Sequence, residues 1–455
     1  MTILAIDWSV VSIKILQFIL SISILVVLHE LGHFLTARWF KCRVEKFYLF
    51  FNPGFSLFKK KIGETEYGLG WIPFGGYVKI SGMIDESMDK EQMKQPAQPW
   101  EFRSKPAWQR LIIMLGGVTV NVLLAFAIFI AIMWIWGEKY IPATNLKYGV
   151  YADSLARRIG VEDGDKIVAV GGKPIEKIGT VGTRIIMDQA KSITIERSGQ
   201  KMELAIPEGF INQLNKNRLG GFTYVRIPLV VDSVLPSARI LQGGIRKGDT
   251  LAAFNGHPVH YNTDLYNTNY TDSIDKLKDK PLTLAFIRNG KDTVQTQVML
   301  SNKGDLGVRY QSTEEILGSK QIKYSLVEAI PAGIKKSVQT LTDYIRNLKL
   351  LFTSKEVKVQ DSLGGVVTMA NIFPGVWDWQ YFWQLTAVFS ILLAFMNILP
   401  IPALDGGHAL FTLVEMITGR KPSDKFIEYA QMTGMILLLG LMAYALGLDI
   451  FRLFK

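Results

Sequence analysis

The feature of the sequence that most constrains the fold is its set of long segments without a charged residue. Three such segments run from Leu111 to Gly137, from Trp379 to Leu404 and from Tyr429 to Leu448. A helix of about 20 apolar residues crosses the hydrocarbon core of a bilayer. A fourth apolar segment, Ile15 to Leu28, reaches that length if its helix continues toward Arg38. The sequence therefore predicts an α-helical integral membrane protein with four transmembrane helices.

The first apolar segment differs from a secretory signal peptide. A signal peptide has a basic start, a short apolar stretch and a cleavage site of small residues. Here Asp7 lies in the start, and the residues HELGH, positions 29–33, follow the apolar stretch. We therefore expect this segment to remain in the protein as its first transmembrane helix.

The positive charge of the chain, +11 at pH 7, is explained by a membrane topology rather than by nucleic acid binding. Basic residues gather after the first apolar segment, between 38 and 61, and between the last two segments, from 420 to 425. Loops rich in lysine and arginine face the cytoplasm. This rule places both termini and residues 138–378 on the extracytoplasmic side. The single cysteine, Cys42, excludes an intramolecular disulfide and is expected to be a free cytoplasmic thiol.

The extracytoplasmic segment contains an internal repeat. The sequence GDKIVAVGGKP begins at Gly164, and GDTLAAFNGHP begins at Gly248, an offset of 84 residues. Strand-like segments and turns follow each copy, which predicts two similar β-rich domains. Both copies resemble the glycine–aspartate strand of PDZ domains, which bind extended peptides by adding a strand to a sheet edge. The alternative is that the two β modules only space or shield the membrane part.

Three other segments have a recognisable local pattern. Residues 47–82 combine glycines and prolines with aromatic and β-branched residues, which predicts a membrane-associated β-hairpin loop. Residues 85–105 are polar, include prolines and are typical of a linker. Residues 325–353 carry apolar residues at helical spacing with basic residues among them. We expect this amphipathic helix on the membrane surface, under the second β-rich domain, or as an ordinary packing helix.

The HELGH motif carries the strongest chemical signal. On a helix, His29 and His33 lie one turn apart on the same face, so both imidazoles reach one zinc ion. Glu30 lies about 100° round the helix and is placed to act as a general base toward an attacking water. Ionisable residues near the end of an apolar span are costly and are usually functional. The structural alternative is a helix whose polar residues mark its exit into water.

A zinc site with two histidines lacks a third protein ligand, and residues 397–408, NILPIPALDGGH, offer candidates. Their prolines break a helix, and their paired glycines let the backbone approach another segment closely. The chemistry of the residues favours Asp405 as the third ligand, with His408 as the competing candidate. His257 and His260 lie in the extracytoplasmic segment and are expected at the surface.

Together these motifs resemble the site-2 protease family, peptidase family M50. The resemblance rests on HELGH in the first span and Asn-x-x-Pro-x-Pro-x-Leu-Asp-Gly-Gly in the third, with two PDZ-like domains between the second and third spans. It covers essentially the whole chain. It implies that His29, His33 and Asp405 bind Zn²⁺ and that Glu30 is the catalytic base.

The resemblance also implies residues that lie beside the active site or hold the substrate. Gly117 and Asn121 match a Gly-x-x-x-Asn pattern in the second span, and a glycine-rich segment matches a β-loop that pairs with an unwound substrate. One departure is LGGVV at 363–367, where relatives commonly have Gly-Pro. The implied substrate-binding residues are Asn121, Asn397, Gly75, Gly76 and Tyr77.

The predicted function is zinc-dependent cleavage, within the bilayer, of single-span membrane proteins that another protease has already trimmed. Anti-sigma factors and signal-peptide remnants are the expected substrates, and the expected location is the bacterial cytoplasmic membrane. The alternative is a proteolytically inactive membrane tether or chaperone that uses its PDZ-like domains. The predicted domains are 1–137 with the first two spans, 138–218 and 219–312 as PDZ-like domains, 313–378 as an amphipathic connector, and 379–455 with the last two spans.

Overall fold

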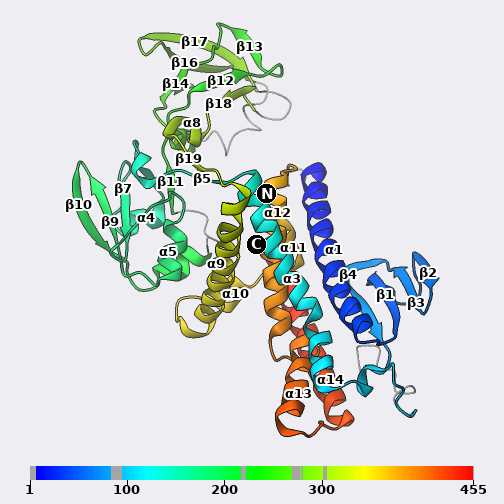
Figure 1. The fold of residues 1–455 in the computed structure, drawn as a ribbon. Coiled ribbons are helices and arrows are strands. Elements are labelled where there is room, and N and C mark those ends of the chain that lie inside the picture. Colours follow the sequence, from blue (N-terminus) through cyan, green and yellow to red (C-terminus); the bar gives the residue numbers. More distant parts are fainter. Residues whose placement is uncertain are drawn as a thin grey trace. The chain divides into compact units, whose positions relative to one another are not determined.

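The computed structural model describes residues 7–83, 95–216, 222–268, 277, 280–300 and 305–453. Residues 85–94 of the predicted linker, and the predicted boundary between residues 218 and 219, lie outside the described residues. The chain divides into two compact units (Figure 1). The first unit comprises the chain up to Gly137, Lys323–Lys349 and the chain from Leu363 onward; the second comprises Glu138–Ile322 and Leu350–Ser362.

The first unit is built on four helices that are long and apolar enough to cross a membrane. They correspond to the four predicted spans, which the structure confirms as helices. Asp7 caps the first of them, because its side chain accepts a hydrogen bond from the backbone N–H of Ser9 at 3.0 Å. The four helices are α1 (Trp8–Trp39), α3 (Ala107–Ile135), α12 (Trp379–Ile398) and α14 (Asp424–Leu453).

Small and polar residues allow these helices to pack closely. A Cβ added at Gly32 of α1 would lie 2.3 Å from the carbonyl oxygen of Gly116 on α3, so only glycine permits this approach. Ser21 of α1 and Thr386 of α12 share a buried hydrogen bond of 2.9 Å. Packing and interhelical hydrogen bonds hold membrane helices together, because lipid offers no hydrophobic drive for their association.

The glycine-rich segment after α1 forms a four-stranded sheet in the order β2-β3-β1-β4, so the predicted single hairpin is wrong in size. β1 runs parallel to β3 and antiparallel to β4. The connection from β3 to β4 passes close to β1 and requires glycine at position 70, because a Cβ there would lie 2.3 Å from the carbonyl oxygen of Phe51. The strands are β1 (Val44–Phe51), β2 (Phe58–Ile62), β3 (Thr65–Leu69) and β4 (Ile72–Ile80).

Further helices complete the first unit. The predicted amphipathic helix is α9 (Leu326–Thr353), which belongs to the first unit up to Lys349. Its Tyr344 ring meets Phe395 of α12 edge-on, with 5.4 Å between ring centroids, so α9 is a packing helix of the bundle in this part of its length. The others are η1 (Phe102–Ser104), α11 (Val366–Ile372) and α13 (Asp405–Thr418).

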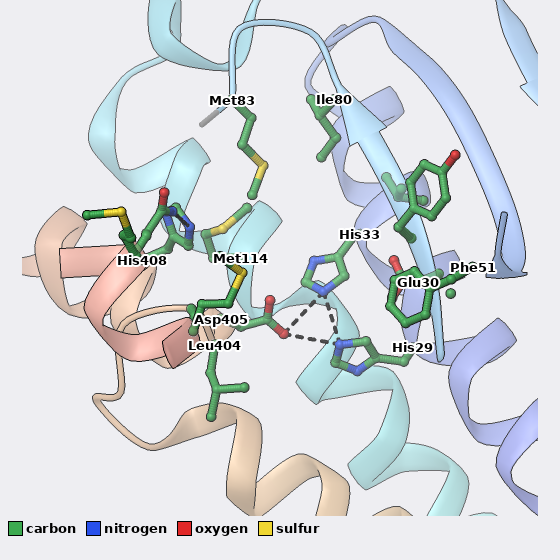
Figure 2. Close-up of a pocket in the computed structure, with 17 residues that line it drawn as sticks. His29, Glu30, His33, Phe51, Ile80, Met83, Met114, Leu404, Asp405 and His408 are labelled. Atoms are coloured by element: carbon green, nitrogen blue, oxygen red, sulfur yellow. Dashed lines mark hydrogen bonds and ion pairs between the residues drawn. The ribbon is translucent and has the colours of Figure 1, made fainter. Parts of the chain in front are cut away.

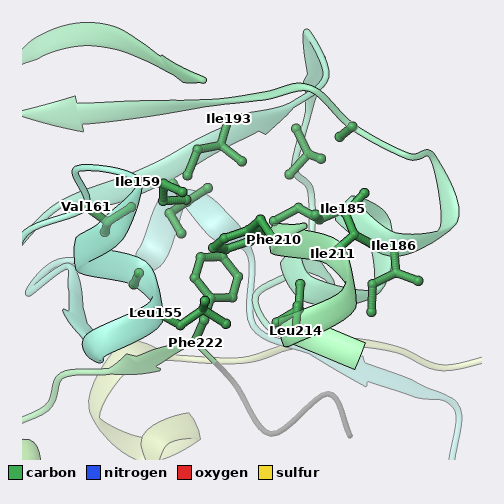
Figure 3. Close-up of a cluster of buried hydrophobic side chains, with 14 of the residues drawn as sticks. Leu155, Ile159, Val161, Ile185, Ile186, Ile193, Phe210, Ile211, Leu214 and Phe222 are labelled. Carbon is green, nitrogen blue, oxygen red and sulfur yellow. The ribbon is translucent and has the colours of Figure 1, made fainter. Parts of the chain in front are cut away.

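The second unit begins with a β module whose main sheet has the order β10-β9-β7-β8. Its core lies between this sheet and three short helices (Figure 3). Phe210 and Phe222 meet edge-on at 5.7 Å within that core. The elements are β5 (Glu138–Tyr140), η2 (Ala143–Asn145), β6 (Val150–Ala152), α4 (Ser154–Arg158), β7 (Lys166–Val170), β8 (Lys173–Pro174), α5 (Val181–Met187), β9 (Ser192–Arg197), β10 (Gln200–Ala205), α6 (Phe210–Lys216) and β11 (Thr223–Val225).

A second β module follows, with a main sheet in the order β13-β17-β16-β14-β15. Its core is a separate cluster of buried residues that includes Leu251, Phe254 and Phe286. The elements are β12 (Val231–Val234), β13 (Arg239–Gln242), β14 (Thr250–Phe254), β15 (His257–Pro258), η3 (Asn262–Thr268), β16 (Leu282–Arg288), β17 (Asp292–Met299), β18 (Val308–Tyr310), α8 (Thr313–Leu317) and β19 (Lys320–Ile322). Later in the chain, α10 (Val359–Ser362) returns to the first module, where Ser362 hydrogen-bonds to Asn215 of α6 at 3.0 Å.

The internal repeat has the same local structure in both modules. β7 and β14 are equivalent strands, and each begins directly after the aspartate of its Gly-Asp pair. Arg197 donates to both carboxylate oxygens of Asp165, each at 2.8 Å. Arg288 donates to both oxygens of Asp249, at 2.9 and 2.8 Å. Both aspartates are 1 % exposed, so each module is held by its own buried Asp–Arg fork.

The Asp–Arg fork of the second module generates a prediction. The hydrogen bonds from Arg288 hold the pKa of Asp249 below its usual range. The fork therefore stabilises the module fully at pH values above the pKa that Asp249 has in the unfolded chain. This stabilisation is lost as the pH falls through the pKa of Asp249 in the folded protein. At pH 7 we expect Asp249→Asn to speed hydrogen exchange in β14 and β16 by about tenfold or more, and the difference from wild type should shrink on acidification.

Asp165→Asn is the matched control for this measurement on the full-length protein. It should speed exchange in β7 and β9 of the first module and leave β14 and β16 unchanged. Equal effects of either variant on both modules would contradict independent forks.

Candidate metal centre and active site

Two histidines of α1 and one aspartate of α13 converge on a single point in the first unit (Figure 2). Asp405 Oδ2 lies 3.1 Å from His29 Nε2 and 3.2 Å from His33 Nε2. The two Nε2 atoms are 3.3 Å apart. One atom from each of the three residues thus lies within 4.8 Å of the others, which is the arrangement of ligands around one metal ion.

A broken helix presents the aspartate. α12 ends at Ile398 and α13 begins at Asp405, so the predicted proline break separates them. Within the turn, Ala403 has a φ of 81°, a conformation that costs energy for a residue with a side chain. A Cβ added at Gly406 would lie 2.2 Å from the carbonyl oxygen of Leu399, so this turn requires glycine. The turn directs the carboxylate toward α1.

The second long helix, α3, holds the far side of both imidazoles. His33 Nδ1 lies 2.8 Å from the carbonyl oxygen of Ile113, an acceptor that places a hydrogen on Nδ1 and leaves the Nε2 lone pair for a metal. His29 Nδ1 lies 3.1 Å from the side-chain amide of Asn121. Between these contacts, a Cβ added at Gly117 would lie 2.5 Å from His33 Nε2, so α3 approaches the rings only because this residue is glycine.

A cavity of about 340 Å³ opens beside these residues. Glu30 lines it together with the three converging residues. β4 passes directly by Glu30, since a Cβ added at Gly76 would lie 3.6 Å from Glu30 Cγ. The walls are otherwise mainly apolar and are completed by Phe51, Gly76, Tyr77, Val78, Ile80, Met83, Met114, Ala403, Leu404, His408, Gln431, Met432 and Met435.

The remaining predicted substrate-binding residues differ in how close they lie to the cavity and to the histidines. Asn397 Nδ2 lies 3.4 Å from His29 Nε2, at the edge of the converging residues. Tyr77 lines the cavity and stacks on Tyr48, with 5.2 Å between ring centroids. Gly75 has a φ of 139° and borders the Phe51 ring, so it shapes β4 without lining the cavity.

The three remaining histidines lie apart from the converging residues. His408 lines the same cavity, but its ring hydrogen-bonds to the Gln431 amide. In Figure 2 the His408 side chain lies apart from the point where His29, His33 and Asp405 meet. Asp405 is therefore the residue that joins the histidine pair in the structure. His257 and His260 are exposed in the second unit, as predicted.

Sequence reasoning missed part of the cavity wall. Four methionines from three separate segments line it, as does Gln431 of α14. In the sequence, a methionine that lines a cavity looks the same as a methionine that faces lipid or packs in a core. No local signal therefore predicts that these methionines line the cavity. The methionines are Met83, Met114, Met432 and Met435.

The donor set fits zinc. Two imidazole nitrogens and one carboxylate oxygen are the ligands that catalytic zinc sites use, with a further position for water or substrate. At least one of the imidazoles is held by a second hydrogen-bonding partner, as metal-binding histidines usually are. A carboxylate as third ligand also balances part of the positive charge of the ion in a poorly hydrated place.

Comparison with known proteins agrees with this chemistry. Residues 17–441 match the model of peptidase family M50. The chain belongs to this family. A protein of Treponema pallidum (strain Nichols), named as a zinc metalloprotease, is 27 % identical over 445 residues, covering 93 % of this chain and 95 % of the relative.

Two further relatives carry the same kind of name. One from Xylella fastidiosa (strain Temecula1 / ATCC 700964) is 28 % identical and covers 95 % of this chain and 97 % of its own length. One from Ralstonia nicotianae is 29 % identical and covers 97 % and 99 %. This M50 member is accordingly a zinc-dependent metalloprotease with four helices that are long and apolar enough to cross a membrane.

The close approach of α3 generates a prediction about the metal centre. Gly117→Ala places a methyl group against both imidazole rings, which overpacks the contact by about 1–3 kcal/mol and pushes α3 away from α1. We expect lower zinc affinity of the purified protein, measured by competition with a chelator. Gly447→Ala on α14 is the control, because a Cβ there meets nothing within 4 Å. Equal zinc affinity in the two variants would contradict the packing argument.

Proposed function

We propose that this M50 member cleaves peptide bonds at membrane depth, with zinc held by His29, His33 and Asp405 and with Glu30 as the catalytic base. One observation carries the proposal. The three potential ligands and Glu30 share a cavity among helices that are long enough to span a bilayer. Ionisable groups in that setting are costly and mark functional sites.

The residues in and beside the cavity have distinct roles in this reaction. When bound, zinc supplies Lewis acidity that polarises the scissile carbonyl and makes water more acidic. Glu30 accepts a proton from the attacking water and delivers it to the leaving amine. Asp405 supplies negative charge and fixes the distance between α13 and α1. Asn397, 3.4 Å from His29, is positioned to donate a hydrogen bond to a substrate carbonyl.

The substrate backbone needs an extended conformation, because a helix hides its peptide bonds. β4 is an edge strand, since among the described residues it pairs only with β1. It passes Glu30 at Gly76, so an unwound substrate segment added to this edge would lie beside the base. Gly75, Gly76 and Tyr77 thereby act on the substrate through the shape and edge of β4.

The proposed substrates are single-span membrane proteins that a first protease has already trimmed, such as anti-sigma factors, together with signal-peptide remnants. The proposed location is the bacterial cytoplasmic membrane, with the two β modules on the extracytoplasmic side as PDZ-like domains. The folded, duplicated modules support a size filter that excludes substrates with large extracytoplasmic domains. A proteolytically inactive tether would not need Glu30 at the cavity wall.

The role of Glu30 is tested by Glu30→Gln, which keeps the size of the side chain but removes the base. We expect cleavage of a tagged, pre-trimmed single-span reporter to fall about 10²- to 10⁴-fold, because general base catalysis contributes that much. Zinc content should stay near wild type, since Glu30 is not a ligand. Asp405→Asn is the matched comparison and should lose zinc as well as cleavage.

Activity in Glu30→Gln near the wild-type level would overturn the assignment of the base. Wild-type cleavage that survives a zinc chelator would overturn the metal mechanism. A fragment that forms equally with every variant would be the product of another enzyme. That result would favour the alternative of a proteolytically inactive tether.

The size filter is tested with a series of reporters that share one membrane segment and differ only in the extracytoplasmic domain. We expect the short stub to be cut and a reporter with a folded domain to survive, because such a domain cannot pass the two β modules. Fragment yield on blots from cells expressing wild type or Glu30→Gln measures this. Equal cutting of all reporters would exclude the filter.

A further inference from the structure

A buried asparagine behind the metal centre has no role yet that fits its position. The family resemblance makes Asn121 a substrate-binding residue, but its side chain is 0 % exposed and does not line the cavity. Its amide instead lies 3.1 Å from His29 Nδ1, on the side of the ring that faces away from Asp405. Any effect of Asn121 on catalysis therefore passes through His29.

The position of Asn121 on α3 is part of a regular pattern. Ile113, Gly117 and Asn121 are spaced by four residues and so share one face of the helix. The Ile113 carbonyl contacts His33, Gly117 gives both rings space, and Asn121 contacts His29. One stripe of α3 thus meets the far nitrogens of both histidines of the α1 pair.

The two imidazoles need the same arrangement of hydrogens if both bind one metal through Nε2. For His33, the Ile113 carbonyl accepts from Nδ1 and leaves the Nε2 lone pair for the metal. His29 likewise needs an acceptor at Nδ1, where the structure places the amide nitrogen of Asn121. The amide oxygen, Asn121 Oδ1, is buried and has no hydrogen-bond partner among the described residues.

A half-turn of the Asn121 amide resolves this mismatch. It exchanges Oδ1 and Nδ2 without moving other atoms, and it breaks no hydrogen bond of Oδ1. Oδ1 then accepts from His29 Nδ1–H. The backbone of Asn121 is itself fixed, because Ser390 Oγ of α12 donates to its carbonyl oxygen at 2.7 Å.

We propose that Asn121 is a positioning residue for the metal centre: its amide oxygen accepts the Nδ1 hydrogen of His29, which fixes the ring and leaves Nε2 for zinc. This inference rests on the proposed zinc site. It replaces the substrate contact that the resemblance implied with a contact to a ligand. Partners of this kind typically change metal affinity by about 10- to 100-fold when removed.

The test measures zinc affinity of the full-length protein in detergent, by competition with a chromophoric chelator. Asn121→Leu keeps the approximate volume and removes the acceptor, so affinity should fall about 10- to 100-fold. Asn121→Asp keeps an acceptor at the same place and should restore affinity toward wild type. With Co²⁺ in place of zinc, the visible absorption bands should shift in the Leu variant and return in the Asp variant.

Thr386→Val is the matched control. It removes a buried polar group from the same helix bundle, one that bonds Ser21 and not a proposed ligand, so zinc affinity should stay near wild type. If Asn121→Leu aggregates, Asn121→Ala takes its place.

Three outcomes would overturn the inference. Unchanged affinity in the Leu variant would remove the acceptor role. Equal losses in the Leu and Asp variants would show that Asn121 is needed only for packing. If wild type itself bound neither metal, the zinc site of the proposed function would fail, and this result is distinguishable because no variant would then bind.

Discussion

The approach of α3 to α1 is the contact on which the metal centre depends. Gly32 and Gly116 bring the two backbones together, and Gly117 lets α3 reach the imidazoles of α1. With a larger residue at any of these positions, the Ile113 carbonyl and the Asn121 amide would lose contact with the histidines. In a bilayer, where close packing replaces the hydrophobic effect between helices, small residues therefore determine the chemistry as well as the fold.

The polar residues of the candidate site lie among long apolar helices, and each is matched by a group from another element. Asp405 reaches both histidines from a turn that follows a proline break, and the Asn397 amide borders the same point. Irregular backbone in a bilayer is tolerated where it is buried in protein or lines a cavity. Ala403 and Leu404 at the end of this turn line the cavity. The break between α12 and α13 thus places the carboxylate of Asp405 beside the histidines of α1.

Local patterns in the sequence were enough for much of this architecture. Charge-free length predicted the four long helices, helical spacing paired His29 with His33, and the chemistry of the third span favoured Asp405. The sheet order was beyond reach, because the parallel pairing of β1 with β3 depends on contacts between segments and not on local propensity. The burial of Asn121 was equally hidden, since a motif gives spacing along one helix but not which neighbour covers it.

The carboxylate of Asp449 near the end of α14 accepts a hydrogen bond at 3.0 Å from the backbone N–H of Thr368, in the first turn of α11, 81 residues earlier in the chain. The N-cap residue of α11 is Gly365, which has no side chain to accept a hydrogen bond from the first turn. During synthesis α11 therefore leaves the ribosome before its cap exists. The hydrogen bond that caps the N-terminus of α11 can therefore form only after the last long helix has been synthesised.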